Sequence, residues 1–146
     1  MKYFVFLTLF AFSTSIKGQM YNESPFNAQV ANPKYNKSKG PKVLIDAGHH
    51  NFIVELGLAK PLIDVANSDG YQVVIDSMQF TKEYLSNYKL VIILPAMPFT
   101  FGSKKQVTDE ITFSKDELNA LHEWVLNGGR LLIFSEHAPI DKSVTP

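Results

Sequence analysis

The chain has 146 residues, of which 45% are hydrophobic, and its 14 basic and 14 acidic residues give a formal net charge of zero. This length and composition indicate a single ordinary globular domain, and the charge balance argues against a nucleic-acid partner. The chain has no cysteine, which excludes disulfide bonds and thiol nucleophiles. Its stability must therefore come from a hydrophobic core or a bound ligand.

The first eighteen residues have the pattern of a secretory signal peptide. Lys2 precedes an apolar stretch, residues 3–12, and small polar residues follow at positions 13–15. The apolar stretch is about ten residues long, which is too short to span a bilayer. Cleavage after Gly18 would remove Lys2 and Lys17 and leave 12 basic against 14 acidic residues, a net charge of −2. We expect a secreted or periplasmic protein without a transmembrane segment in the mature chain.

Residues 19–40 are rich in Asn, Pro, Lys, Ser and Gly and show no helical or strand periodicity, which predicts a linker or a loosely packed arm. The folded domain is predicted to span residues 41–146. It should alternate strands and helices, and the segment 96–112 between them shows no periodicity, which is typical of a functional or flexible loop. The predicted strands are 42–46, 71–75, 90–94 and 130–134, and the predicted helices begin near Pro61, Thr81 and Ser114.

The last predicted helix has the clearest sequence signals. Ser114 and Glu117 form a capping box, with Phe113 and Leu118 at the positions of a hydrophobic staple, and Gly128-Gly129 ends the helix. We expect one face of this helix to pack on the core and His122 to be a packed histidine. The predicted core positions are Leu118, Leu121, Trp124 and Val125.

This alternation predicts an α/β fold with a small parallel, flavodoxin-like sheet flanked by helices. In such sheets ligands lie beyond the carboxyl ends of the strands. Polar residues follow both the first and the fourth predicted strand, and a 2-1-3-4 strand order would place these two strand ends roughly 10 Å apart. The predicted ligand-binding residues are Asp46, His49, His50, Asn51, Ser135, Glu136 and His137.

Three interpretations of this cluster remain open from the residues alone. His49, His50, Glu136 and His137 could ligate a divalent metal, since imidazole and carboxylate suit zinc. Asp46 could orient His49 or His137 as a general base for a Ser135 nucleophile. In the third interpretation, Asp46 and Asn51 hold the loop through backbone amides, and Glu136 pairs with a histidine to join two strand ends.

Five segments resemble uncharacterised, mostly bacterial proteins of the class I glutamine amidotransferase-like superfamily that carry a domain of unknown function. The resemblance implies an amidotransferase-like α/β fold without amidotransferase chemistry, because Ser135 stands near the place of the catalytic cysteine. Relatives more often have Asp-His where this chain has Glu136-His137, and their domains continue further, which implies a domain truncated after its fourth strand. The matching segments are D-A-G-H-H-N-F (46–52), S-D-G-Y-Q-V (68–73), F-S-K-D-E-L (113–118), W-V-L-N-G-G-R-L-L-I (124–133) and S-E-H-A-P (135–139).

A shorter segment, V-L-I-D-A-G-H (43–49), is similar to the opening of zinc-dependent N-acetylmuramoyl-L-alanine amidases, in which that histidine binds zinc. The likeness covers far less of the chain. Those enzymes have a glycine pair where this chain has His50-Asn51, and a serine-isoleucine-histidine strand end where it has L-P-A-M-P (94–98).

These observations predict a non-catalytic extracytoplasmic ligand-binding or interaction module that uses the strand-end cluster and needs no cofactor. The alternative is a metal-assisted hydrolase acting on an envelope or extracellular substrate, with His49, Glu136 and His137 as candidate metal ligands. A small molecule, a glycan or an envelope component are the expected partners.

Overall fold

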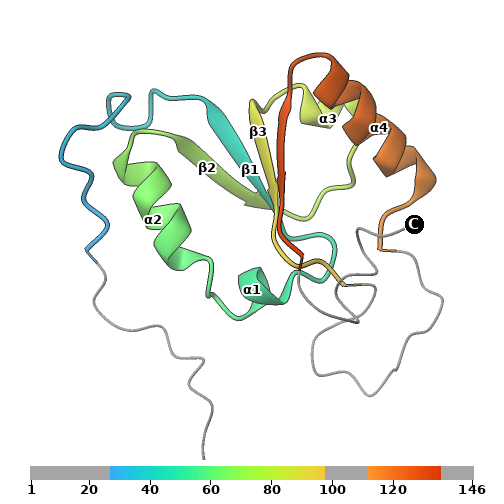
Figure 1. Ribbon diagram of the computed structural model, residues 1–146, viewed down its shortest axis with the longest axis horizontal. Coiled ribbons are helices and arrows are strands. Elements are labelled where there is room, and N and C mark those ends of the chain that lie inside the picture. The colour runs from blue at the N-terminus through green and yellow to red at the C-terminus, as the bar shows by residue number, and fades with distance from the viewer. Residues whose placement is uncertain (1–26, 98–111, 136–146) are drawn as a thin grey trace, which may run out of the picture.

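The computed structural model describes residues 27–97 and 112–135 and shows one four-stranded sheet (Figure 1). All strand pairs are parallel and the strand order is β2-β1-β3-β4. The predicted α/β class and parallel sheet are therefore confirmed, and the 2-1-3-4 order is the one that brings the first and fourth strand ends near each other. The strands are β1 (Lys42–Asp46), β2 (Gln72–Asp76), β3 (Leu90–Ile93) and β4 (Arg130–Ile133).

Helices cover both faces of the sheet. The first pair, α1 (Phe52–Glu55) and α2 (Lys60–Ser68), lies on one face, and α3 (Lys82–Leu85) and α4 (Lys115–Leu126) lie on the other (Figure 1). The predicted helix starts at Pro61, Thr81 and Ser114 agree with these bounds. Helix α1 was not predicted from the sequence, because four residues are too few to show a helical period.

The core forms on both sides of β1, which explains why this strand has a continuous apolar sequence. Leu44 is fully buried and packs with Val91 and the α3–α4 side chains. Val43 and Ile45 point to the opposite face and pack with Ala59 near α2. Because β1 is buried on both faces, its last residue, Asp46, is also excluded from water.

The buried face of α4 differs from the predicted one. Glu117, Leu121 and Trp124 are buried, whereas Leu118 is 51% exposed and Val125 is 40% exposed. The assignment of Leu118 and Val125 to the core was therefore wrong, and so was that of His122, which is exposed. The physical reason is that Leu121 and Trp124 pack in the core, and Glu117, one turn before Leu121, is buried with them because its carboxylate accepts from His49 and from the Phe80 N–H.

The fourth strand lies at the edge of the sheet and is only partly covered. Leu132, Ile133 and Phe134 are each between 43% and 45% exposed. The helices α1 and α2 extend over β1, β2 and β3 but leave Leu132, which points to that face, accessible. Within the described ranges, no helix has the length and apolar character needed to cross a membrane.

Part of the predicted arm packs against the end of α2 in the structure. Tyr35 N–H donates to the Asp69 carbonyl at 3.2 Å and Gly40 N–H donates to the Gly70 carbonyl at 2.8 Å. The Tyr35 ring also meets the Tyr71 ring edge-on, with centroids 5.1 Å apart. Residues 35–40 thus contact the folded domain, and the predicted signal peptide lies outside the described residues.

The capping box of α4 gives a first prediction. Ser114 Oγ accepts from the Glu117 N–H at 3.3 Å and donates to Glu117 Oε2 at 2.8 Å. Because Ser114→Ala removes the cap, we expect the free energy of unfolding to fall by about 1 kcal/mol. Urea denaturation checks this, with the exposed Ser77→Ala as control, which should change stability by less than about 0.5 kcal/mol. Equal effects of the two substitutions would contradict the role of the cap.

Candidate functional site

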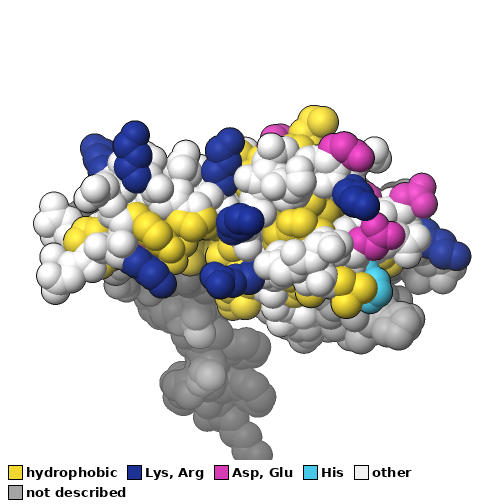
Figure 2. Space-filling model, turned by 90° about the horizontal axis from the view of Figure 1, so that it is seen from above, with side chains coloured by type: hydrophobic (Ala, Val, Ile, Leu, Met, Phe, Trp, Pro, Cys, Tyr) yellow, Lys and Arg dark blue, Asp and Glu magenta, His cyan; other side chains and the backbone are white. Residues whose placement is uncertain are grey.

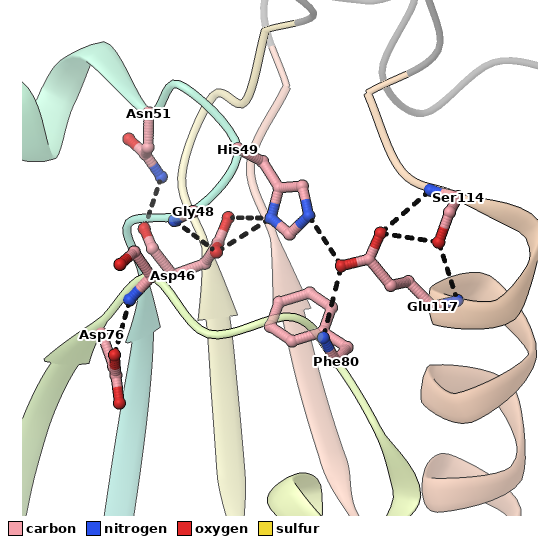
Figure 3. Close-up of polar contacts among 9 residues, drawn as sticks. Asp46, Gly48, His49, Asn51, Asp76, Phe80, Ser114 and Glu117 are labelled. Carbon is pink, nitrogen blue, oxygen red and sulfur yellow. Dashed lines mark hydrogen bonds and ion pairs between the residues drawn. The ribbon is translucent and has the colours of Figure 1, made fainter.

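The candidate site begins where β1 ends, at Asp46 (Figure 3). Asp46 is fully buried, and its Oδ1 accepts from the Gly48 N–H at 3.0 Å. Gly48 is required here because a Cβ at this position would lie 2.9 Å from the Ser77 carbonyl oxygen. The chain can therefore turn tightly at the sheet edge and return His49 toward Asp46.

His49 bridges two carboxylates from opposite parts of the chain. Its Nδ1 lies 2.9 Å from Asp46 Oδ1, and its Nε2 lies 3.1 Å from Glu117 Oε1 on the first turn of α4 (Figure 3). The ring is only 8% exposed and packs against Phe113 and Phe80, with centroid distances of 4.3 Å and 5.1 Å. We call Asp46, His49 and Glu117 the buried triad.

Glu117 links three elements through its two carboxylate oxygens. Oε1 accepts from His49 Nε2 and from the Phe80 N–H at 3.3 Å. Oε2 accepts from the Ser114 N–H at 3.0 Å and from Ser114 Oγ. The same side chain therefore caps α4, fixes the segment after β2 and holds the imidazole.

This geometry matches a protonated His49 between two ionised carboxylates. Carboxylates only accept hydrogen bonds, and an imidazole donates from both nitrogens only as the imidazolium. Burial opposes the charged ring, but the hydrogen bond and charge of Asp46, followed by those of Glu117, outweigh it and raise the pKa of His49 above 6.5. Burial also opposes the charged form of Glu117 and by itself would raise its pKa. Hydrogen bonds from Ser114 and Phe80 and the charge of His49 outweigh burial and lower the pKa of Glu117 below 4.5. The triad is thus an ion cluster with both nitrogens of His49 engaged.

The residues after His49 close the loop onto the sheet. Asn51 is fully buried, donates from Nδ2 to the Asp46 carbonyl at 3.3 Å, and accepts at Oδ1 from the Val54 N–H to cap α1. The Met97 N–H donates to the His49 carbonyl at 3.0 Å and so joins the loops that follow β1 and β3. For Asp46 and Asn51, the interpretation in which they hold the loop through backbone groups is confirmed.

Of the predicted site residues, His50 and Ser135 are exposed at this edge of the sheet. His50 adopts a φ of +45°, and its Nδ1 lies 3.6 Å from Glu55 Oε1. Ser135 follows β4, which neighbours β3 and lies two strands from β1. Glu136 and His137 lie outside the described residues, so their predicted proximity to His49 stays a prediction.

The described side chains do not fit a metal centre. In residues 27–97 and 112–135, no group of three His, Asp or Glu side chains is placed to hold a metal ion. Both nitrogens of His49 face carboxylates at hydrogen-bond distance, so neither is available as a ligand without breaking the buried triad. The metal interpretation therefore depends on Glu136 and His137, beyond the described part of the chain.

Glu117 and Phe80 belong to this site although the sequence analysis did not place them there. The sequence pattern assigned Glu117 only to the capping box. A capping residue needs no further partner, so the contact with His49, 68 residues away, was not predicted. Phe80 contributes its backbone N–H, which no sequence pattern reveals. The sequence signal that could have suggested the pair is an acid in the first turn of an amphipathic helix together with a histidine that directly follows a buried strand.

The buried triad predicts a stability maximum at mildly acidic pH. Since the pKa of His49 is raised on folding, its contribution is complete below 6.5 and is lost as the pH rises through the folded-state value. Since the pKa of Glu117 is lowered, its contribution is present above 4.5 and is lost as the pH falls through the folded-state value. Urea denaturation over a pH series should therefore give the largest triad contribution between 4.5 and 6.5. Subtracting the profile of His49→Gln isolates the part that depends on His49, since Glu117 keeps its hydrogen bonds from Ser114 and Phe80 in that variant. A pH-independent difference would contradict this part.

The parallel sheet, its 2-1-3-4 order and a polar site at the strand ends define the chain as a flavodoxin-like α/β domain. Comparison with protein-family models and with curated proteins finds no match. Among solved structures, the chain is similar to a ThuA-like protein from Bacteroides uniformis, with 18% sequence identity and a TM-score of 0.42. The similarity covers 73% of this chain but 43% of that protein, so the chain spans less than half of its length.

Proposed function

We propose that this chain is a non-catalytic, extracytoplasmic ligand-binding module of the amidotransferase-like type, whose ligand binds over the carboxyl ends of β1 and β3. The observation that supports this most is the engagement of both ring nitrogens of His49 by Asp46 and Glu117. A general base or nucleophile activator needs one free nitrogen directed at its substrate. His49 has none, so it orients the site without exchanging protons with a ligand.

The position of the proposed site follows from the topology of the sheet. Strand order reverses between β1 and β3, and ligands of doubly wound sheets bind in the crevice at this point. The loops that follow these two strands are joined by the hydrogen bond from Met97 to His49. The buried triad holds this edge in one geometry, while His50 and Ser135 are exposed on its surface.

Thermal-shift screening of the purified chain against sugars, short peptides and divalent metals tests this proposal. A true ligand should raise the melting temperature by several degrees, because binding to the folded state alone stabilises it. The shift should be lost in His50→Ala and kept in His122→Ala, which removes an exposed histidine from the middle of α4. A shift that is equal in wild type and both variants would remove this edge from the binding site.

The alternative function is a metal-assisted hydrolase, which requires the buried triad to open. His49 and Glu117 would then be metal ligands together with Glu136 and His137, which lie outside the described residues. Metal analysis after purification without chelators distinguishes the two functions. One equivalent of zinc, manganese or iron that is lost in Glu117→Gln would favour the hydrolase, and a metal-free protein would favour the binding module.

The extracytoplasmic location rests on the signal-peptide pattern of residues 1–18. Expression with its own leader in a bacterial host, followed by fractionation and N-terminal sequencing, tests this part separately. We expect the exported chain to begin at Gln19. Recovery of the uncleaved chain from the cytoplasm would refute the location and leave the ligand site untouched.

A further inference from the structure

Basic side chains gather at the end of the molecule opposite to the candidate site. Five of the nine described Lys and Arg residues lie at the amino end of the sheet, and all five are exposed. Figure 2 views this end and shows basic side chains spread across it, while the acidic ones gather over the side of α3 and α4. We call these five residues the amino-edge basic face: Lys37, Lys39, Lys42, Lys89 and Arg130.

The starts of three strands bring three of these cations near one another. The Lys89 N–H donates to the Lys42 carbonyl at 3.0 Å, and the Arg130 N–H donates to the Lys89 carbonyl at 3.2 Å. Lys42 begins β1, Lys89 directly precedes β3, and Arg130 begins β4 as the register partner of Leu90. Neighbouring strands are about 4.8 Å apart, so like charges at these strand starts repel one another.

The repulsion is not offset by carboxylates in the described part of the chain. The lysines that form ion pairs there are Lys60 with Asp64 and Lys82 with Glu123, and both pairs lie outside the amino-edge basic face. None of the five residues of the face pairs with an acid among residues 27–97 and 112–135. An external anionic surface would relieve the repulsion and use the full charge of the face.

We propose that the amino-edge basic face docks the domain on an anionic lipid bilayer. Four of the five cations are lysines, which act as point charges on a diffuse anionic surface, whereas shaped recognition of single phosphates favours arginine. The cations come from a turn and from three strand starts, so they spread over one end of the molecule and do not line a groove. Leu126 is 73% exposed at the end of α4, near Arg130, and supplies an apolar contact with the interface.

Docking in this orientation leaves the candidate site accessible. The strands run from the amino-edge basic face to the carboxyl edge, so the two lie at opposite ends of the sheet. A strand of five residues is about 16 Å long. The carboxyl edge would therefore face the aqueous phase, away from the lipid.

Vesicle co-sedimentation of the full chain tests the proposal. The measured quantity is the difference in partition coefficient between phosphatidylglycerol–phosphatidylcholine vesicles and pure phosphatidylcholine vesicles, which cancels any charge-independent binding by other segments. Each Lys or Arg near an anionic surface contributes about a fivefold change. The triple variant Lys42→Gln, Lys89→Gln, Arg130→Gln should therefore lower the difference on the order of 100-fold. The matched control Lys60→Gln, Lys82→Gln, Lys115→Gln has the same net charge but changes lysines outside the face.

The control should retain most of the preference for anionic vesicles, and raising the salt from about 0.1 M to about 1 M should abolish it, since the screening length falls from about 10 Å to about 3 Å. Equal losses in the two triple variants would overturn the proposal, because net charge and not this face would then determine binding. Absence of any preference for anionic vesicles would also overturn it. Binding to a DNA duplex that exceeds vesicle binding at the same phosphate concentration would overturn the assignment to lipid. Far-ultraviolet circular dichroism of both variants confirms that each is folded.

Discussion

Replacing His49 by alanine is expected to lower the free energy of unfolding at neutral pH by about 3–5 kcal/mol, the usual effect of removing one partner of a buried ion pair. The substitution leaves Asp46, which is fully buried, and Glu117, which is 6% exposed, without the cation between them. Two buried carboxylates then lack compensation, and loss of the ring also leaves an empty space beside Phe80 and Phe113. Urea denaturation monitored by the fluorescence of Trp124 measures the loss.

Two further variants determine the source of this loss. His122→Ala removes an exposed histidine and should change stability by less than about 0.5 kcal/mol. Adding Glu117→Gln to His49→Ala should restore part of the lost stability, because the amide keeps the capping position of Glu117 and removes one uncompensated charge. A double variant that is less stable than His49→Ala would mean that Glu117 stabilises α4 mainly by its charge and that the contact with His49 is secondary.

The second large effect is expected at Gly70, where the arm meets the end of α2. Gly70 has a φ of +90°, and a Cβ there would lie 2.3 Å from the carbonyl oxygen of Tyr35. Gly70→Ala combines an unfavourable backbone conformation of about 1–2 kcal/mol with overpacking of about 1–3 kcal/mol. We therefore expect a total loss of about 2–5 kcal/mol in the free energy of unfolding.

Gly128 offers a matched control for this substitution. It also follows a helix and also has a φ of +90°, but a Cβ there would meet nothing within 4 Å. Gly128→Ala should therefore show only the backbone term of about 1–2 kcal/mol. The difference between the two variants measures how firmly residues 35–40 are held against the domain. Equal losses would mean that this segment moves away at little cost, and Lys37 and Lys39 would then contribute less to the amino-edge basic face.

The two edges of the sheet carry different parts of the proposed activity. The carboxyl edge is held by the buried triad, and the ligand is proposed to bind at its surface. The amino edge carries positive charge that forms no ion pair with an acid of the described residues, and it is proposed to bind an anionic surface. The thermal-shift and vesicle experiments test these parts separately, because His50→Ala changes one edge and the Lys42, Lys89 and Arg130 substitutions change the other.

Local chemistry made several features of this protein predictable from sequence. Four apolar runs specify four buried or half-buried strands, and the alternation with helices specifies a parallel sheet, since parallel strands need crossover connections. The Ser114–Glu117 capping box and the Gly128 turn define α4 because caps depend on neighbouring residues alone. The clustering of Asp46, His49 and Asn51 also follows from sequence, because all three lie within six residues that start at the last residue of β1.

The sequence by itself thus determined the class of fold, the helix caps and the polar strand end, because these depend on residues close together in the chain. Only the tertiary structure decided which partner each polar group takes. Glu117 reaches His49 across 68 residues, and α4 packs with Glu117, Leu121 and Trp124 inward while Leu118 and Val125 are exposed. Lys42, Lys89 and Arg130 lie near one another only because three parallel strands, distant in sequence, start at the same end of the sheet. Such contacts depend on how the elements pack, and the packing minimises the burial of unpaired charge over the whole chain.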